Sequence, residues 1–196
     1  MTLIALPTGF CPNMFNLRMK TSELGFGSPY GGSEQVVDKL NDRWLLSLSL
    51  PNRTHAQAAA IEAFIGSLRG MTNTVALYHW VRKVPRGSMR GAPKTNGVLQ
   101  GAKQILIFTT PAATLLAGDM FGAGGLLFQV ESDCVADGAG NLLVPIINRV
   151  RKALPALTDV VWDRPTAPFR LASPSSVQYV PGYAPEVAFD FVEAIG

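Results

Sequence analysis

The sequence predicts an α+β, β-rich fold: an antiparallel β-sandwich or barrel with one packed amphipathic helix and a long basic loop. Most apolar segments are short and alternate with period two, as half-buried strands do. Only residues 54–69 show helical periodicity. The 196-residue chain also contains 19 Gly and 14 Pro, a content typical of a protein with many turns.

Residues 43–50 are the clearest predicted strand, because apolar residues occupy every second position. These are Trp44, Leu46, Leu48 and Leu50. They share one face of a strand, and the residues between them share the other. Pro51 ends the strand, since proline has no N–H to donate to a neighbouring strand.

The predicted helix follows at once, over residues 54–69. Thr54 with Gln57 three positions later is a capping box, in which each side chain accepts from the other residue's backbone N–H. Gly70 suits the left-handed position after a helix end. The core positions of the helix are Ile61, Phe64, Ile65 and Leu68, which form one apolar stripe. Such a stripe needs a sheet to cover.

Further strands are expected at 13–20, 74–81, 104–110, 126–135, 142–147, 159–162 and 168–171. The turn Asp137–Asn141 predicts that 126–135 and 142–147 form a hairpin. The expected organisation has an N-terminal arm with edge strands (1–42), a β-rich core domain (43–172) and an extended C-terminal tail (173–196). Residues 25–32 are interpreted as a packed loop or a contact-making arm, and residues 189–192 as a candidate last strand.

Charge is uneven along the chain, although its net value is only +3. No acidic residue occurs between Glu62 and Asp119, and residues 82–103 form the Gly- and Pro-interrupted basic loop. Its cations are Arg82, Lys83, Arg86, Arg90, Lys94 and Lys103. Two uses are open: neutralising phosphates of a nucleic acid, or contacting protein at a subunit interface. The loop has no aromatic residue on which bases could stack, which favours protein contact.

Catalytic chemistry has little support. The only histidines are His55 and His79, and no Cys, His or Asp spacing matches a metal site. Glu131, Asp133 and Asp137 are candidate paired carboxylates or cation ligands, but the solvated face of a hairpin is the favoured interpretation. The sequence therefore predicts no enzyme, no catalytic residues, no metal and no cofactor.

Targeting signals are equally sparse. Cys11 and Cys134 are the only cysteines and are expected to be ordinary core residues in a reducing compartment, with one disulfide between them as the alternative. The N-terminus lacks the pattern of an export signal. No apolar run is long enough to cross a membrane, and a cytoplasmic place of synthesis is expected.

The order of short motifs between residues 40 and 172 resembles small structural proteins of tailed bacteriophages. The motifs are Trp44-x-Leu46-x-Leu48-x-Leu50-Pro51, the helix end Phe64 to Gly70, Gly118-Asp119, Leu127 to Val130, Asp133 to Gly140, Pro145, Arg149 or Arg151, and Pro168 to Leu171. The first 40 residues and the acidic tail with Glu186, Asp190 and Glu193 lie outside the resemblance.

The resemblance implies a tail-tip component of the distal-tail or tail-tube type, located in the virion tail. Its partners would be further copies in a ring, with a hexamer as one candidate size, the tail tube protein, the tail hub and other tail-tip proteins. The tape measure protein is a further candidate. DNA would pass through the lumen without specific binding. The alternative from the residues is a β-barrel nucleic-acid-binding module that uses the loop 82–103.

Overall fold

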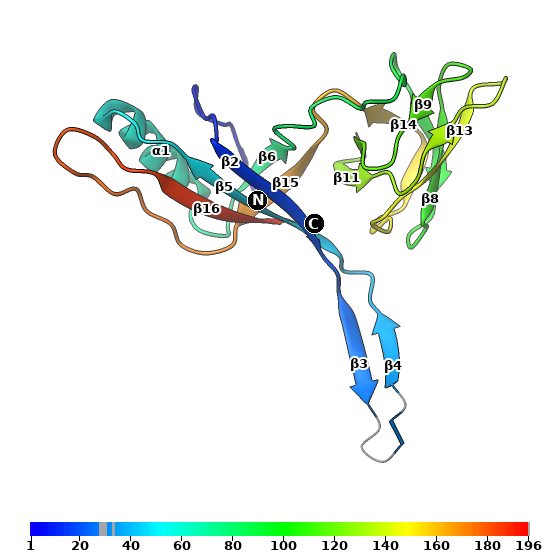
Figure 1. The fold of residues 1–196 in the computed structure, drawn as a ribbon, viewed down its shortest axis with the longest axis horizontal. Helices are drawn as coiled ribbons and strands as arrows, with labels where there is room; N and C mark the ends of the chain where they lie inside the picture. Colours follow the sequence, from blue (N-terminus) through cyan, green and yellow to red (C-terminus); the bar gives the residue numbers. More distant parts are fainter. Residues whose placement is uncertain (28–30, 33, 196) are drawn as a thin grey trace. The chain divides into compact units, whose positions relative to one another are not determined.

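The computed structural model describes residues 1–27, 31–32 and 34–195. The chain divides into two compact units (Figure 1). Unit 1 comprises residues 1–18, 44–81 and 166–196, and unit 2 comprises residues 19–43 and 82–165. The stretch 43–172, expected from the sequence as one core domain, thus contributes to both units. The β-rich architecture with a single helix confirms the predicted fold class.

Unit 1 is built on a six-stranded sheet in the order β1-β6-β15-β16-β5-β2. Its strands are β1 (Leu3–Ile4), β2 (Met14–Lys20), β5 (Arg43–Leu50), β6 (Thr74–Tyr78), β15 (Thr166–Leu171) and β16 (Val187–Glu193). All pairings given for this sheet are antiparallel except the parallel pair of β1 and β6. Trp44, Leu46, Leu48 and Leu50 are buried as predicted.

Helix α1 (His55–Leu68) completes unit 1 (Figure 1). Its capping box is present, with Thr54 and Gln57 accepting from each other's backbone. The helix ends through left-handed residues Arg69 (φ 48°) and Gly70 (φ 65°). Ile61, Phe64, Ile65 and Leu68 are buried, which confirms the predicted core stripe.

Unit 2 contains a second six-stranded sheet, in the order β11-β10-β14-β7-β8-β13. Its strands are β7 (Lys94–Val98), β8 (Gln104–Phe108), β10 (Met120–Ala123), β11 (Leu126–Gln129), β13 (Asn141–Pro145) and β14 (Leu154–Val161). Strands β11 and β13 stand at the two ends of this order. The residues that follow them, Val130 and Ile146, form a β-bridge. Ile147 N–H donates to the Gln129 carbonyl at 3.0 Å beside this bridge, so the sheet closes on itself as a barrel.

The barrel core is apolar, and Phe121 and Phe128 pack in it with ring centroids 5.4 Å apart and ring planes tilted by 31°. A short two-stranded sheet is formed by β9 (Thr114–Leu115) and β12 (Cys134–Val135), which fall between barrel strands in the sequence. The hairpin of β3 (Glu23–Gly27) and β4 (Glu34–Asp38) also belongs to unit 2. Among the described residues, no helix is long and apolar enough to cross a membrane.

Three sequence expectations are corrected. Residues 126–135 and 142–147 do not form the predicted hairpin: β11 pairs with β10, and β13 pairs with β8. The reason is local, because Gly124 (φ 57°) and Gly125 (φ 79°) make the two-residue left-handed turn that joins β10 to β11. Among the described residues, one β-bridge, between Val130 and Ile146, links the segments 126–135 and 142–147.

The other two corrections concern segments expected to be irregular. The basic loop 82–103 includes β7, which pairs with both β14 and β8. The tail 173–196 was expected to be extended apart from a candidate strand at 189–192; that strand is confirmed as part of β16, which is longer and lies between β15 and β5. Thr95 in β7 and Phe189 and Phe191 in β16 are buried, so these strands are parts of the two cores. Gly97 (φ 69°) interrupts the alternation of buried and exposed residues in β7. The sequence of this segment therefore lacks the period-two pattern by which a strand is recognised.

Candidate functional site: an anchored basic segment and an exposed hairpin

Residues 82–93, the first half of the predicted basic loop, form an irregular but ordered segment. Pro85, Gly87 and Met89 are buried, while Arg86, Ser88 and Arg90, each of which follows one of them, are exposed. Only a glycine fits at position 87, because a Cβ there would lie 2.1 Å from the Thr114 carbonyl oxygen. The segment therefore lies directly against the backbone of β9.

Asp119 holds this segment. Its carboxylate is buried and accepts from the N–H groups of Arg86 (3.0 Å), Gly87 (3.0 Å) and Leu116 (2.9 Å). The Arg86 guanidinium adds an ion pair at 3.2 Å. A carboxylate that accepts several backbone N–H donors is a strong fixed anchor, because each of these bonds is charge-assisted.

The environment of Asp119 shifts its pKa in a defined direction. Burial raises the pKa, but the donors Leu116, Gly87 and Arg86 lower it by more, so the pKa lies below its ordinary value. Asp119 is therefore ionised at neutral pH. Its charge is satisfied by backbone N–H groups and one arginine, an arrangement that serves structure rather than proton transfer.

Arg90 is held by the carbonyls of its own segment. Its guanidinium donates to the carbonyls of Pro85 (3.1 Å), Gly87 (2.9 Å) and Met89 (2.6 Å). It also lies over the ring of Trp162, 5.1 Å from the centroid. Trp162 in turn donates its indole N–H to the Gly91 carbonyl at 2.9 Å. This cation–π contact fixes the turn at residues 85–91.

Four of the six predicted loop cations thus have acceptors in the same chain. Arg82 donates to the Gly118 carbonyl at 2.6 Å, and Lys94 pairs with Asp159 at 3.1 Å. Lys83 and Lys103 are exposed. Whether any of these side chains also contacts another subunit stays a prediction. Their contacts do show that most of the segment's charge is committed to holding unit 2 together.

Every residue of β3 and β4 is exposed. The hairpin register places Leu24 opposite Val37 and Phe26 opposite Gln35, and these four side chains share one face. We call it the apolar hairpin face. Leu24, Phe26 and Val37 are 41%, 53% and 41% exposed on it.

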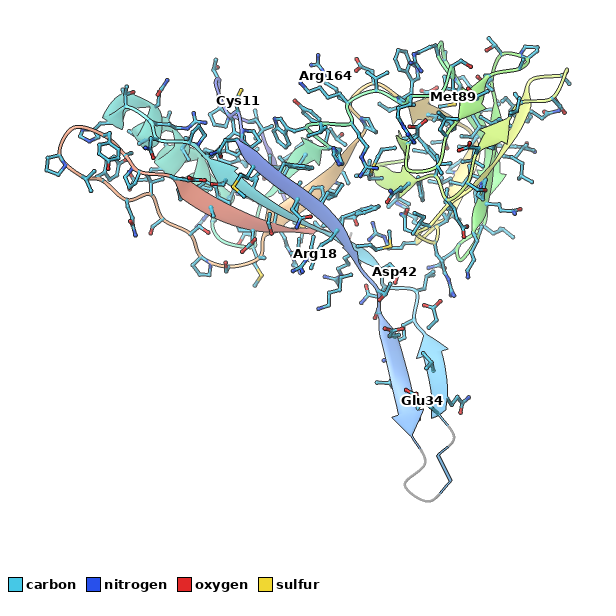
Figure 2. The ribbon with its side chains drawn as sticks, in the orientation of Figure 1. Cys11, Arg18, Glu34, Asp42, Met89 and Arg164 are labelled. Atoms are coloured by element: carbon cyan, nitrogen blue, oxygen red, sulfur yellow. The ribbon has the colours of Figure 1, made fainter. Side chains whose placement is uncertain are left out.

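The opposite face of the hairpin is acidic. It carries Glu23, Glu34 and Asp38, together with Val36. Residues 23–38 contain no Lys or Arg. Figure 2 shows Glu34 on β4 and Asp42 beyond the end of that strand. The hairpin is therefore amphipathic across its two faces, and its apolar face lacks a covering layer.

The base of the hairpin is tied to the barrel. Asp38 forms an ion pair with Arg149, and Arg151 donates to the Asp42 carbonyl at 2.6 Å. Ser22 N–H donates to the Asp42 carboxylate at 3.1 Å, which fixes the entry of the chain into β3. The hairpin is thus held at its base while its apolar face stays open.

Sequence reasoning identified residues 25–32 only as a loop or arm. The signal that would have found the hairpin is the alternation on either side of the glycines, with Leu24 and Phe26 before them and Gln35 and Val37 after them. Five residues of that range, 25–27 and 31–32, are described, and residues 28–30 lie outside the described residues.

Several of the remaining sequence candidates take part in local contacts. Asp133 accepts from Ala117 N–H at 2.7 Å, and Asp137 accepts from Asn141 N–H at 2.8 Å, so both support turns. His55 contacts the Val180 carbonyl, and His79 is buried against Phe15. Within residues 1–27, 31–32 and 34–195, no group of three or more His, Cys, Asp or Glu is arranged to hold a metal ion.

Three depressions in unit 1 have volumes of about 280, 380 and 290 Å³. Glu62 is the one carboxylate in the first, Arg53 the one cation in the second, and the third is lined by uncharged residues such as Met14 and Ser47. In the described part of the chain, none of these three combines a nucleophile with a histidine.

Comparison of the chain with models of known protein families gave no match, and comparison with curated protein sequences gave none either.

Proposed function

We propose that this protein is a virion structural protein of a bacteriophage tail, a ring-forming distal-tail adaptor that links the tail tube to the tail-tip hub. In this role it acts through interfaces and is not an enzyme. The observation that carries the proposal is the amphipathic hairpin, anchored at Asp38 and exposed at Leu24, Phe26 and Val37. The motif resemblance and the β-rich fold with one helix support the same assignment.

The hairpin supports assembly because it is not a stable unit by itself. An isolated two-stranded hairpin is marginally stable in water, and it gains stability when a further layer covers its apolar face. Three large apolar side chains exposed side by side are typical of a surface that a partner covers. In a ring, a neighbouring copy supplies that cover at every position.

The basic segment has a supporting part in this proposal. Arg86 and Arg90 shape the segment through Asp119 and Trp162, so the cations serve chiefly to keep unit 2 rigid. Deleting residues 84–100 would not test an assembly role, because it would remove β7 from between β14 and β8. The hairpin is the better target.

The experiment compares neighbouring valines on opposite hairpin faces. Wild type, Val37→Ser and Val36→Ser are examined by size-exclusion chromatography with light scattering and by negative-stain microscopy. Val36 and Val37 lie on the same strand and are 57% and 41% exposed. Because both variants replace a valine with a serine, the change in intrinsic strand propensity is the same. We expect rings for wild type and Val36→Ser, and smaller species for Val37→Ser.

A wild-type chain that stays monomeric at its highest soluble concentration would contradict the proposal. The position in the tail is tested separately, by asking whether the rings bind one end of polymerised tail tube protein from the same virion. The nucleic-acid alternative predicts instead that a labelled oligonucleotide binds tightly, with an affinity that falls steeply as salt rises. For an adaptor we expect only weak, non-specific binding.

A further inference from the structure

One depression of unit 1, with a volume of about 280 Å³, lies between helix α1 and the segment that follows β15. The helix contributes Glu62, Ile65 and Gly66 to its lining, and the later segment contributes residues 174–177. Of the described residues that line it, Glu62 alone is charged. Small-molecule sites typically exceed about 300 Å³, so this depression accommodates one amino-acid side chain rather than a larger ligand.

The depression lies at the end of the unit 1 sheet from which the chain does not cross to unit 2. The crossings are at 18–19, 43–44, 81–82 and 165–166. The last three fall at the start of β5, after the end of β6 and at the start of β15, and the strand register places these ends together. The first falls late in β2, which begins beside the far end of β5, where Asn13 N–H donates to the Ser49 carbonyl at 3.0 Å. The depression is at the other end, where β15 finishes at Leu171, six residues or about 20 Å along that strand. It is therefore built by unit 1 alone.

Glu62 has no cation beside it. The Tyr179 hydroxyl donates to one oxygen of its carboxylate at 2.6 Å, which holds the carboxylate at the wall of the depression. No Lys or Arg lies three or four positions from Glu62 on the helix, and no ion pair joins it to any residue that the structure describes. Gly66 belongs to the last turn of the helix, whose carbonyl groups carry partial negative charge. Arg69 follows the helix but is not among the lining residues. The depression therefore combines negative charge with an apolar floor.

We propose that this depression binds a lysine side chain presented by a partner protein. The alkyl stem packs on Ile65 and Val177, which are buried and half-buried, and the ammonium group reaches the Glu62 carboxylate. Gly66 leaves room for the stem, because a Cβ there would meet nothing within 4 Å. Glu62, Gly66 and Pro174 are exposed around the depression, so a side chain can enter from another surface. This site does not depend on the proposed ring.

The hydrogen bonding of Glu62 favours lysine over arginine. Tyr179 already occupies one carboxylate oxygen, which leaves a single oxygen for the ligand. An arginine fork binds a carboxylate best through both oxygens, whereas an ammonium group is a compact charge that needs only one. The arrangement therefore suits a lysine.

The test titrates Nα-acetyl-lysine methylamide into the methyl-labelled full chain and follows the methyl NMR signals of Ile65, Leu171 and Val177. We expect these signals to shift with a dissociation constant of about 1 mM, as a ligand of this size reaches. The norleucine analogue, which has an alkyl side chain without the charge, should bind about 3-fold more weakly. The arginine analogue should also bind more weakly than the lysine probe.

Three variants separate charge from shape. Glu62→Gln keeps an acceptor for the Tyr179 hydroxyl and loses the charge, so it should bind the lysine probe about 3-fold more weakly. Gly66→Leu fills the depression and should abolish the shifts. Ala63→Leu is the control, because Ala63 is exposed on the same helix and does not line the depression. The ¹⁹F resonances of Trp44 and Trp80 in 5-fluorotryptophan-labelled protein report whether unit 1 of each variant is folded.

An absence of methyl shifts at probe concentrations well above the expected dissociation constant would overturn the site. Equal affinity for the lysine and norleucine probes would overturn the role of Glu62. Unchanged binding by folded Gly66→Leu would place the probe elsewhere on the chain, and tighter binding of the arginine analogue would overturn the choice of lysine. None of these results bears on the proposed ring, and a monomeric wild type would leave this site standing.

Discussion

Replacing Asp119 with Asn changes one atom of the anchor and leaves its shape unchanged. The Asn side chain has one acceptor oxygen where Asp has two. The four N–H donors lie two at each oxygen: Arg86 N and Nε at one, Gly87 N and Leu116 N at the other. In either orientation of the amide, two donors face an NH₂ group and lose their acceptor.

An unsatisfied buried donor costs about 1–3 kcal/mol. Two such donors, with partial relaxation of the exposed Arg86 side chain, give an expected loss of about 3 kcal/mol for Asp119→Asn. The control is Asp159→Asn, which breaks the exposed pair with Lys94 and should stay within ~0.5 kcal/mol of wild type.

The assay is urea unfolding followed by ¹⁹F NMR of 5-fluorotryptophan-labelled protein. The chain has three Trp residues, and Trp162 lies against the anchored segment through Gly91. Trp44 and Trp80 belong to unit 1 and serve as internal references. A Trp162 transition that shifts by less than ~1 kcal/mol would refute the reasoning that Asp119 holds the segment.

The stability difference between wild type and Asp119→Asn should also depend on pH. Because the pKa of Asp119 is lower in the folded chain than in the unfolded chain, where it is about 3.9, the stabilisation is complete well above that pH. This stabilisation is lost as the pH falls through the pKa that Asp119 has in the folded chain. The stability difference between wild type and Asp119→Asn should therefore shrink below about pH 4.

Three further predictions concern single positions. Gly87→Ala should destabilise the barrel by at least ~2 kcal/mol, since its Cβ would meet the Thr114 backbone at 2.1 Å; Gly138→Ala, which meets nothing within 4 Å, should be near neutral by urea titration. Gly66→Ala should stabilise unit 1 by about 0.5–1 kcal/mol, because this exposed helical glycine has open space at its Cβ. With a disulfide reagent at pH 8, exposed Cys11 should react at least ~10-fold faster than Cys134, because burial and the nearby Asp133 and Asp119 charges raise the pKa of Cys134. Equal rates for the two thiols, or destabilisation of unit 1 by Gly66→Ala, would contradict these expectations.

The sequence by itself determined the local elements. The alternation at 43–50 and the stripe from Ile61 to Leu68 produced β5 and α1 almost residue for residue, because strand faces and helix caps depend on neighbours in the chain. It also identified an irregular basic loop over residues 82–103, of which residues 82–93 are irregular in the structure. These features follow from short-range geometry, which a pattern of residue types records directly.

Only the tertiary structure decided which segments pair. The turn from β10 to β11 is local, but β13 pairs with β8 from more than 30 positions away, and Asp119 is brought to Arg86 from 33 positions away. Such contacts depend on long-range packing that no local pattern encodes. The open apolar face of the hairpin emerged in the same way, since the exposure of Phe26 is decided by what the rest of the fold leaves uncovered.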